Sequence, residues 1–99
     1  MIKKGTRVGA ILDSDLKKVR MFGYGVYAGD FVPPKGIKFM GVELHDIKGH
    51  TNPKIVLDNG EVVWGCECWW GPEEAVKQTI HGRRVVAVSI KKCREEAAK

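Results

Sequence analysis

The segment 54–76, KIVLDNGEVVWGCECWWGPEEAV, constrains the fold more than any other part of the chain. Two strand-like runs in it flank Asn59-Gly60, a dipeptide that readily adopts the positive φ angles of a two-residue hairpin turn. A turn at this dipeptide places Leu57 opposite Val62 in the paired strands. The sequence therefore predicts an antiparallel hairpin at this position.

Alternation along this hairpin predicts one apolar face and one mixed face. The apolar face contains Ile55, Leu57, Val62, Trp64, Cys66, Cys68 and Trp70. The mixed face, typical of a surface that meets water or a partner, contains Lys54, Val56, Asp58, Glu61, Val63, Gly65, Glu67 and Trp69. Trp69 is the one large aromatic residue of the mixed face, so it either packs under a neighbouring element or stands exposed.

A longer strand begins at Val19, and its pattern predicts a bend. Val19 and Met21 alternate with basic residues, but beyond Met21 the apolar phase shifts to Phe22 and Tyr24. A β-bulge near Phe22-Gly23 produces such a shift.

Other runs of apolar and β-branched residues predict strands at 5–12, 39–44 and 83–90. Loops are expected at 30–37, which contains two adjacent prolines, and at 45–53, which is polar and contains an Asn-Pro dipeptide.

The sequence Gly71-Pro72-Glu73-Glu74 predicts the start of a helix. Proline suits the first helical position, and the two carboxylates face the positive end of the helix dipole. We expect this helix at about 72–80, ending near His81-Gly82. The charged tail at 91–99 has helical propensity and is expected to fray unless it docks.

Together these elements predict a mainly-β fold, a small bent barrel of five or six antiparallel strands with one short helix at about 72–80 before the last strand. Twelve glycines fit this architecture, because a barrel of few strands must turn sharp corners. We expect a single domain at 1–90, followed by the charged C-terminal tail at 91–99.

Short motifs spread over about two thirds of the chain carry a family resemblance. A glycine-led strand, Gly5-Thr6-Arg7-Val8, precedes a glycine-rich strand at 22–29, and Gly41-Val42-Glu43-Leu44 and Gly49-His50-Thr51-Asn52 follow. These motifs resemble the SH3-like small barrels, most of all the CAP-Gly domain, and more loosely the KOW-type nucleic-acid barrels. His50 stands where the CAP-Gly signature has lysine. The resemblance therefore implies the architecture, and no ligand-binding residue is carried over.

The three cysteines are Cys66, Cys68 and Cys93. The first two share a face among apolar residues, which favours reduced core thiols over a disulfide. Together with His45, His50 and His81 they could supply metal ligands, but the paired C-x-x-C spacing of common zinc sites is absent. We therefore expect neither a metal nor another cofactor.

The formal charge of +5 arises from 17 basic and 12 acidic side chains. Basic clusters at 3–7, 17–20 and 83–94 would attract polyanions through counterion release, although a solvated rim is an equal alternative.

No stretch is long and apolar enough to cross a bilayer, and no signal peptide is recognisable. We expect a cytoplasmic protein with no membrane partner and leave its oligomeric state open.

These observations predict a non-enzymatic small-barrel binding module that uses a basic face and an exposed aromatic residue to hold an anionic partner, with nucleic acid as the first choice. The candidate binding residues are Trp69, Tyr24, Tyr27, Arg20, Lys18, Arg83, Arg84 and His50. Tyr24 and Tyr27 point to opposite faces of a regular strand, so one is expected in the core and one at the surface. The alternative is a protein-interaction module or small inhibitor that docks on another protein.

Enzymatic activity is not expected from this sequence. Glu61 and Glu67 lie on one face of the hairpin, but no third group is placed to tune the pKa of either. No serine lies in a nucleophile elbow, and no Cys-His signature has recognisable surroundings.

Overall fold

The computed structural model describes residues 2–97. Within this range the strands are β1 (Arg7–Ser14), β2 (Lys18–Phe31), β3 (Lys38–Phe39), β4 (Val42–Glu43), β5 (Asn52–Leu57), β6 (Val62–Trp64), β7 (Trp69–Pro72) and β8 (Arg84–Ala87). The helices are α1 (Glu73–Ile80) and α2 (Ile90–Ala97), with short 3-10 helices η1 (Leu44–Asp46) and η2 (Gly65–Glu67).

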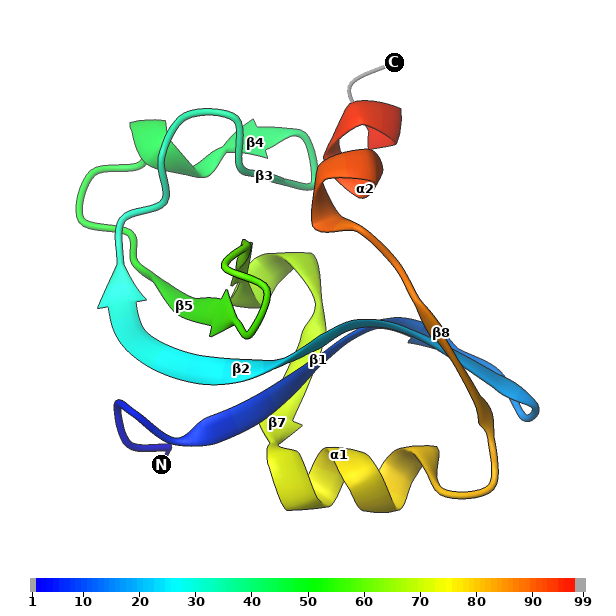
Figure 1. Cartoon of the computed structure of the whole chain (residues 1–99). Helices are drawn as coiled ribbons and strands as arrows, with labels where there is room; N and C mark the ends of the chain where they lie inside the picture. The colour runs from blue at the N-terminus through cyan, green and yellow to red at the C-terminus, as the bar shows by residue number, and fades with distance from the viewer. Residues whose placement is uncertain (1, 98–99) are drawn as a thin grey trace.

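Six of these strands form one strongly bent sheet in the order β6-β5-β2-β1-β7, with β8 also paired to β2 (Figure 1). The 14-residue strand β2 is its centre. Strand β1 lies along one edge of β2, while β8 and β5 share the other edge. The fold class is thus confirmed as a mainly-β, bent and incompletely closed barrel. One pair differs from the expectation, because β8 runs parallel to β2.

The expected bulge in β2 is present. Ala10 pairs with Gly23 and Ile11 pairs with Met21, so Phe22 is the extra residue between the two pairs. Gly23 has a φ of 136°, an angle that residues other than glycine rarely adopt. The bulge bends β2 and directs Met21 and Phe22 into two different buried clusters.

The hairpin between β5 and β6 has the expected position but a different register. The Leu57 N–H donates to the Glu61 carbonyl oxygen at 2.8 Å, so the loop holds three residues and the predicted two-residue turn is wrong. Gly60 adopts a φ of 90°, whereas Asn59 accepts a hydrogen bond from the Glu61 N–H at 2.9 Å through its side chain. A three-residue loop with glycine in the left-handed region is the next most common hairpin connection.

This one-residue shift changes which side chains enter the core. Ile55 pairs with Val63 instead of Trp64, and both Ile55 and Val63 are fully buried. The predicted apolar face also ends early, because η2 interrupts the strand after Trp64. Trp64 is buried, but in a separate cluster with Ile37 and Leu44.

Residues 32–51, which we call the β2–β5 connection, leave the sheet and return to it (Figure 1). The prediction of a single strand at 39–44 is wrong. Two short strands of two residues each, β3 and β4, form an antiparallel hairpin here. Its turn contains Met40 and Gly41, with φ angles of 52° and 82°. Ile37 and Leu44 pack on Trp64 and anchor the connection to the sheet.

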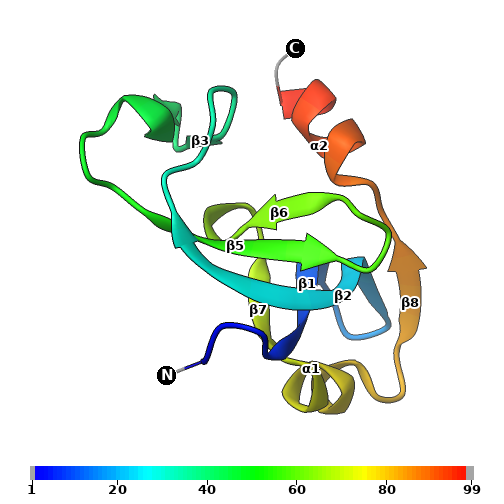
Figure 2. The same ribbon diagram turned by 60° about the vertical axis from the view of Figure 1, so that its left-hand side comes forward.

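The two helices cover different parts of the bent sheet (Figure 2). Helix α1 begins at Glu73 directly after Pro72, so the expected short helix is confirmed. Its fully buried Val76 packs against Ile11, Val19 and Met21. Helix α2 docks on the other side of the sheet, where Ile90 joins the main core cluster of Val8, Ala10, Phe22, Ile55, Leu57 and Val63.

Candidate functional site

Four basic residues come together at one end of the molecule, and we call this surface the basic end. Lys17 and Lys18 lie at the β1–β2 hairpin, while Arg83 and Arg84 lie where the chain leaves α1 and enters β8 (Figure 1). Lys18 pairs with Arg84 in the parallel ladder, and the Arg84 N–H donates to the Lys17 carbonyl oxygen at 2.9 Å. Leu16 is 90% exposed at the hairpin tip beside them.

Carboxylates near the basic end are already engaged. Asp15 accepts hydrogen bonds from the Lys17 and Lys18 N–H groups, each at 2.8 Å, and these bonds lower the pKa of its carboxyl group. Asp13 forms an ion pair with Arg20, whose Nε donates to Asp13 Oδ1 at 2.7 Å. The Arg20 side chain is therefore ion-paired. Among the described residues the Lys17 and Lys18 side chains form no ion pair, so they are available to solvent or to a partner.

Trp69 is exposed, with 53% of its surface accessible. It begins β7 opposite Ile11, and a shallow hollow beside it is also lined by Asp13, Ser14 and Thr79. Of the two alternatives for Trp69, packing under a neighbouring element or standing free, the structure shows an indole that stands largely free beside the end of α1.

The side chains of Tyr24 and Tyr27 pack against the core, and neither is fully exposed to solvent. Both are half-buried, and each packs against a different core cluster, so they do point to opposite faces. The expectation that one is core and one is surface is not met in that simple form. Tyr27 stacks on Trp70 with ring centroids 5.3 Å apart, and its hydroxyl donates to Asp30 at 2.6 Å.

His50 lies apart from the other candidate residues. It is exposed in the β2–β5 connection, and its Nε2 is 3.4 Å from the Asn52 side-chain nitrogen. The connection and the basic end occupy opposite ends of the molecule (Figure 1). Of the predicted binding residues, the fold therefore brings together Lys18, Arg83 and Arg84 and separates them from His50.

The cysteines are free, and all three are half-buried. Among residues 2–97 no group of three or more His, Cys, Asp or Glu side chains is arranged to hold a metal ion. Burial and the nearby Glu67 carboxylate raise the pKa of the Cys68 thiol to about 12. Its Sγ donates to the Trp64 carbonyl oxygen at 3.6 Å, consistent with a neutral packing residue.

Cys68 is expected to react with iodoacetamide more slowly than Cys66 or Cys93. At pH 8 a thiol with a pKa of about 12 is ionised in roughly one molecule in ten thousand, and the thiolate is the reactive form. Peptide mapping by mass spectrometry after timed labelling measures the three rates. In guanidinium chloride the rates should converge, and faster labelling of Cys68 in the native protein would contradict this assignment.

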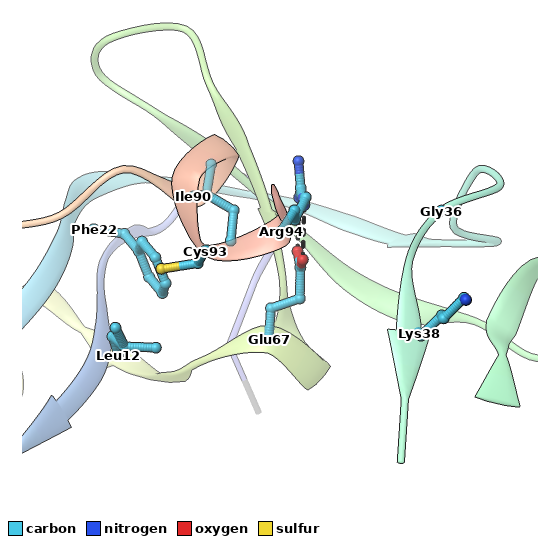
Figure 3. A pocket seen from close by; sticks show the side chains of 8 residues that line it. All are labelled: Leu12, Phe22, Gly36, Lys38, Glu67, Ile90, Cys93 and Arg94. Carbon is cyan, nitrogen blue, oxygen red and sulfur yellow. Dashed lines mark hydrogen bonds and ion pairs between the residues drawn. The ribbon is translucent and has the colours of Figure 1, made fainter. Parts of the chain in front are cut away.

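A cleft that the sequence did not indicate lies under α2 (Figure 3). It contains an ion pair between Arg94 and Glu67, with Nε–Oε2 and Nη2–Oε1 distances of 2.8 and 2.7 Å. The alternation pattern predicts Glu67 on the mixed, solvent-facing side of the hairpin, but its side chain is only 12% exposed. No local pattern signals this pair, because its members are 27 positions apart and meet only when α2 docks.

Searches with this chain found no matching family model, curated protein or solved structure. None of the helices in the described part of the chain is long and apolar enough to span a membrane. The SH3-like and CAP-Gly resemblance therefore stays a prediction.

Proposed function

We propose that this chain is a non-enzymatic binding module that holds nucleic acid through the basic end, with Trp69 as an accessory stacking surface. The observation that carries the proposal is the parallel pairing of β8 with β2. This pairing joins Lys17 and Lys18 to Arg83 and Arg84, from distant parts of the chain, beside the Asp15 carboxylate, which already accepts two backbone hydrogen bonds. Within residues 2–97 none of the four basic side chains forms an ion pair.

Such a cluster suits phosphates better than an isolated acidic side chain. Closely spaced cations release several condensed counterions when they meet a phosphate backbone, and this release drives sequence-independent binding. The end of β1 and the end of α1 contribute Ser14 and Thr79 to the hollow beside Trp69, and the same two segments lead directly into Lys17 and Arg83. A strand held on the basic end could thus place a base on the exposed indole.

Removing the basic end is expected to weaken binding of a fluorescein-labelled DNA or RNA 20-mer by at least about tenfold. The variant is Lys17→Ala, Lys18→Ala, Arg83→Ala and Arg84→Ala combined, measured by fluorescence anisotropy at low salt. A matched variant removes four cations elsewhere, through Lys3→Ala, Lys4→Ala, Lys91→Ala and Lys92→Ala. It should retain affinity within about threefold. Equal losses in the two variants would show that only net charge matters.

Trp69→Ala in the otherwise unchanged chain should weaken the same complexes by roughly five- to a hundredfold if a base stacks on the indole. Trp69→Phe preserves an aromatic face and should retain most of the affinity. Absence of binding by the unmodified chain to any single-stranded or duplex probe would refute the proposed function.

A second candidate function, protein interaction, is favoured by the surface of the β2–β5 connection. Exposed apolar residues gather there and at the end of β2: Phe31, Val32, Phe39, Met40, Val42 and Ile47. Met40 is 87% exposed and also adopts a left-handed φ of 52°, a conformation that is unfavourable for its side chain. A protein captured from extract after nuclease treatment, and lost with Met40→Ser, would favour this function over nucleic-acid binding.

A further inference from the structure

A cleft of about 350 Å³ opens between the β2–β5 connection and α2 (Figure 3). This volume falls within the range of roughly 300–1,000 Å³ typical of small-molecule sites. The cleft contains none of the four residues of the basic end. It is thus a second place on the molecule where a ligand can be held.

The floor of the cleft is apolar and continuous with the core. Phe22 and Ile90 belong to the main buried cluster, and Leu12 and Cys93 pack against it. In Figure 3 the Cys93 sulfur lies against the Phe22 ring, with Leu12 beside it. Atoms that line an open cleft lack contacts on one side, so an apolar ligand body would gain both dispersion and hydrophobic energy here.

The polar groups of the cleft select the charge of a ligand. The Glu67 carboxylate accepts hydrogen bonds from Arg94 Nε and Nη2 and from the Trp64 N–H, so its acceptor capacity is largely used. Arg94 Nη2 also donates to the Val62 carbonyl oxygen. Among the described residues, Arg94 Nη1 and the Lys38 ammonium have no protein acceptor; Lys38 lies on the far side of the Arg94–Glu67 pair from the apolar floor, with its ammonium directed away from the pair (Figure 3). Both unused groups are cationic donors.

We propose that this cleft binds an amphipathic anion, specifically an aliphatic carboxylate. Its chain lies on Leu12, Phe22 and Cys93, and its carboxylate meets Nη1 of Arg94 at the rim, where the exposed Lys38 side chain adds a second cation once it turns toward the cleft. Among the residues that line the cleft in the described part of the chain, a cationic ligand finds no free carboxylate, and a neutral alcohol cannot form a charge-paired hydrogen bond with Arg94 Nη1 or Lys38. This site is independent of nucleic-acid binding at the basic end.

Calorimetric titration with sodium octanoate tests this assignment. Octanoate should bind at one site, and hexanoate should bind about fifteenfold more weakly, because each buried methylene contributes about a fourfold change in affinity. Octylammonium chloride and octan-1-ol should each bind at least about tenfold more weakly than octanoate. Equal binding of octanoate and octylammonium would overturn the proposed charge selection.

Substitutions locate the site. Lys38→Gln should weaken octanoate binding about fivefold or more, whereas Lys35→Gln, in the same connection but outside the cleft, should change it less than about twofold. Cys93→Phe should fill the cleft and abolish binding in a chain whose circular dichroism spectrum is unchanged. Leu12→Phe provides a second filling variant if Cys93→Phe does not fold.

Amide chemical shifts in the unmodified chain provide the decisive comparison. Octanoate should shift the resonances of Phe22, Cys93 and Arg94. Undiminished octanoate binding in a folded filling variant would overturn the proposal. Shifts confined to Leu16, Lys17 and Lys18 would also overturn it and would assign the carboxylate to the basic end.

Discussion

Replacing Gly25 with alanine is expected to lower the free energy of unfolding by about 3 kcal/mol or more, enough to unfold many domains of this size. Gly25 pairs with Leu57 where β2 crosses β5. A Cβ atom at Gly25 would lie 2.7 Å from the Leu57 Cα and in closer contact still with the Val56 carbonyl oxygen. Both neighbours are backbone atoms of β5, so the two strands must separate for alanine to fit.

Gly71→Ala is the matched control for this substitution. Gly71 is also buried in a strand of the same sheet, but a Cβ atom there would meet nothing within 4 Å. We expect its effect to stay within about 0.5 kcal/mol, and urea denaturation followed by circular dichroism measures both variants. Similar stabilities for the two alanine variants would contradict the close β2–β5 contact.

Trp64→Ala should cost about 3–5 kcal/mol of stability, the usual range for removing a large buried aromatic side chain. Trp64 is only 5% exposed and forms a cluster with Ile37 and Leu44. These contacts anchor the β2–β5 connection, so the substitution should also loosen it. The Leu44 amide donates to the Ile37 carbonyl oxygen at 3.1 Å and should lose hydrogen-exchange protection.

Trp69→Ala tests the same residue type at an exposed position. With 53% of its surface accessible, Trp69 should contribute on the order of 1–2 kcal/mol to stability, clearly less than the buried Trp64. Denaturant midpoints of the two tryptophan variants give the comparison. If Trp69→Ala destabilises the chain as much as Trp64→Ala does, the indole has a structural role and the proposed stacking surface loses its basis.

Local sequence rules predict the features of this fold that depend on a few neighbouring residues. The phase shift at Phe22-Gly23 gives the bulge, and Pro72 with Glu73 gives the start of α1. The structure departs from the predicted hairpin register because the Glu61 N–H donates to the Asn59 side chain and a three-residue loop closes the turn. An Asn-Gly dipeptide fits either loop, so the pattern fixes the place of the turn but not its length.

The remaining features depend on contacts between distant segments. The parallel pairing of Lys18 with Arg84 requires α1 to carry the chain across the sheet, and no alternation pattern indicates that pairing. The cleft likewise exists only because Ile90 and Arg94 dock α2 against the sheet. The basic composition is enough to propose an anionic partner. Which basic residues lie together can be seen only in the tertiary structure.

The salt dependence of nucleic-acid binding tests the central claim most directly. If the basic end neutralises about four phosphates of a single strand, the slope of log K against log salt should be about 3 units steeper for the unmodified chain than for the variant lacking Lys17, Lys18, Arg83 and Arg84. The matched variant at Lys3, Lys4, Lys91 and Lys92 should keep the steep slope. Indistinguishable slopes for the unmodified chain and the basic-end variant would contradict the proposed interface.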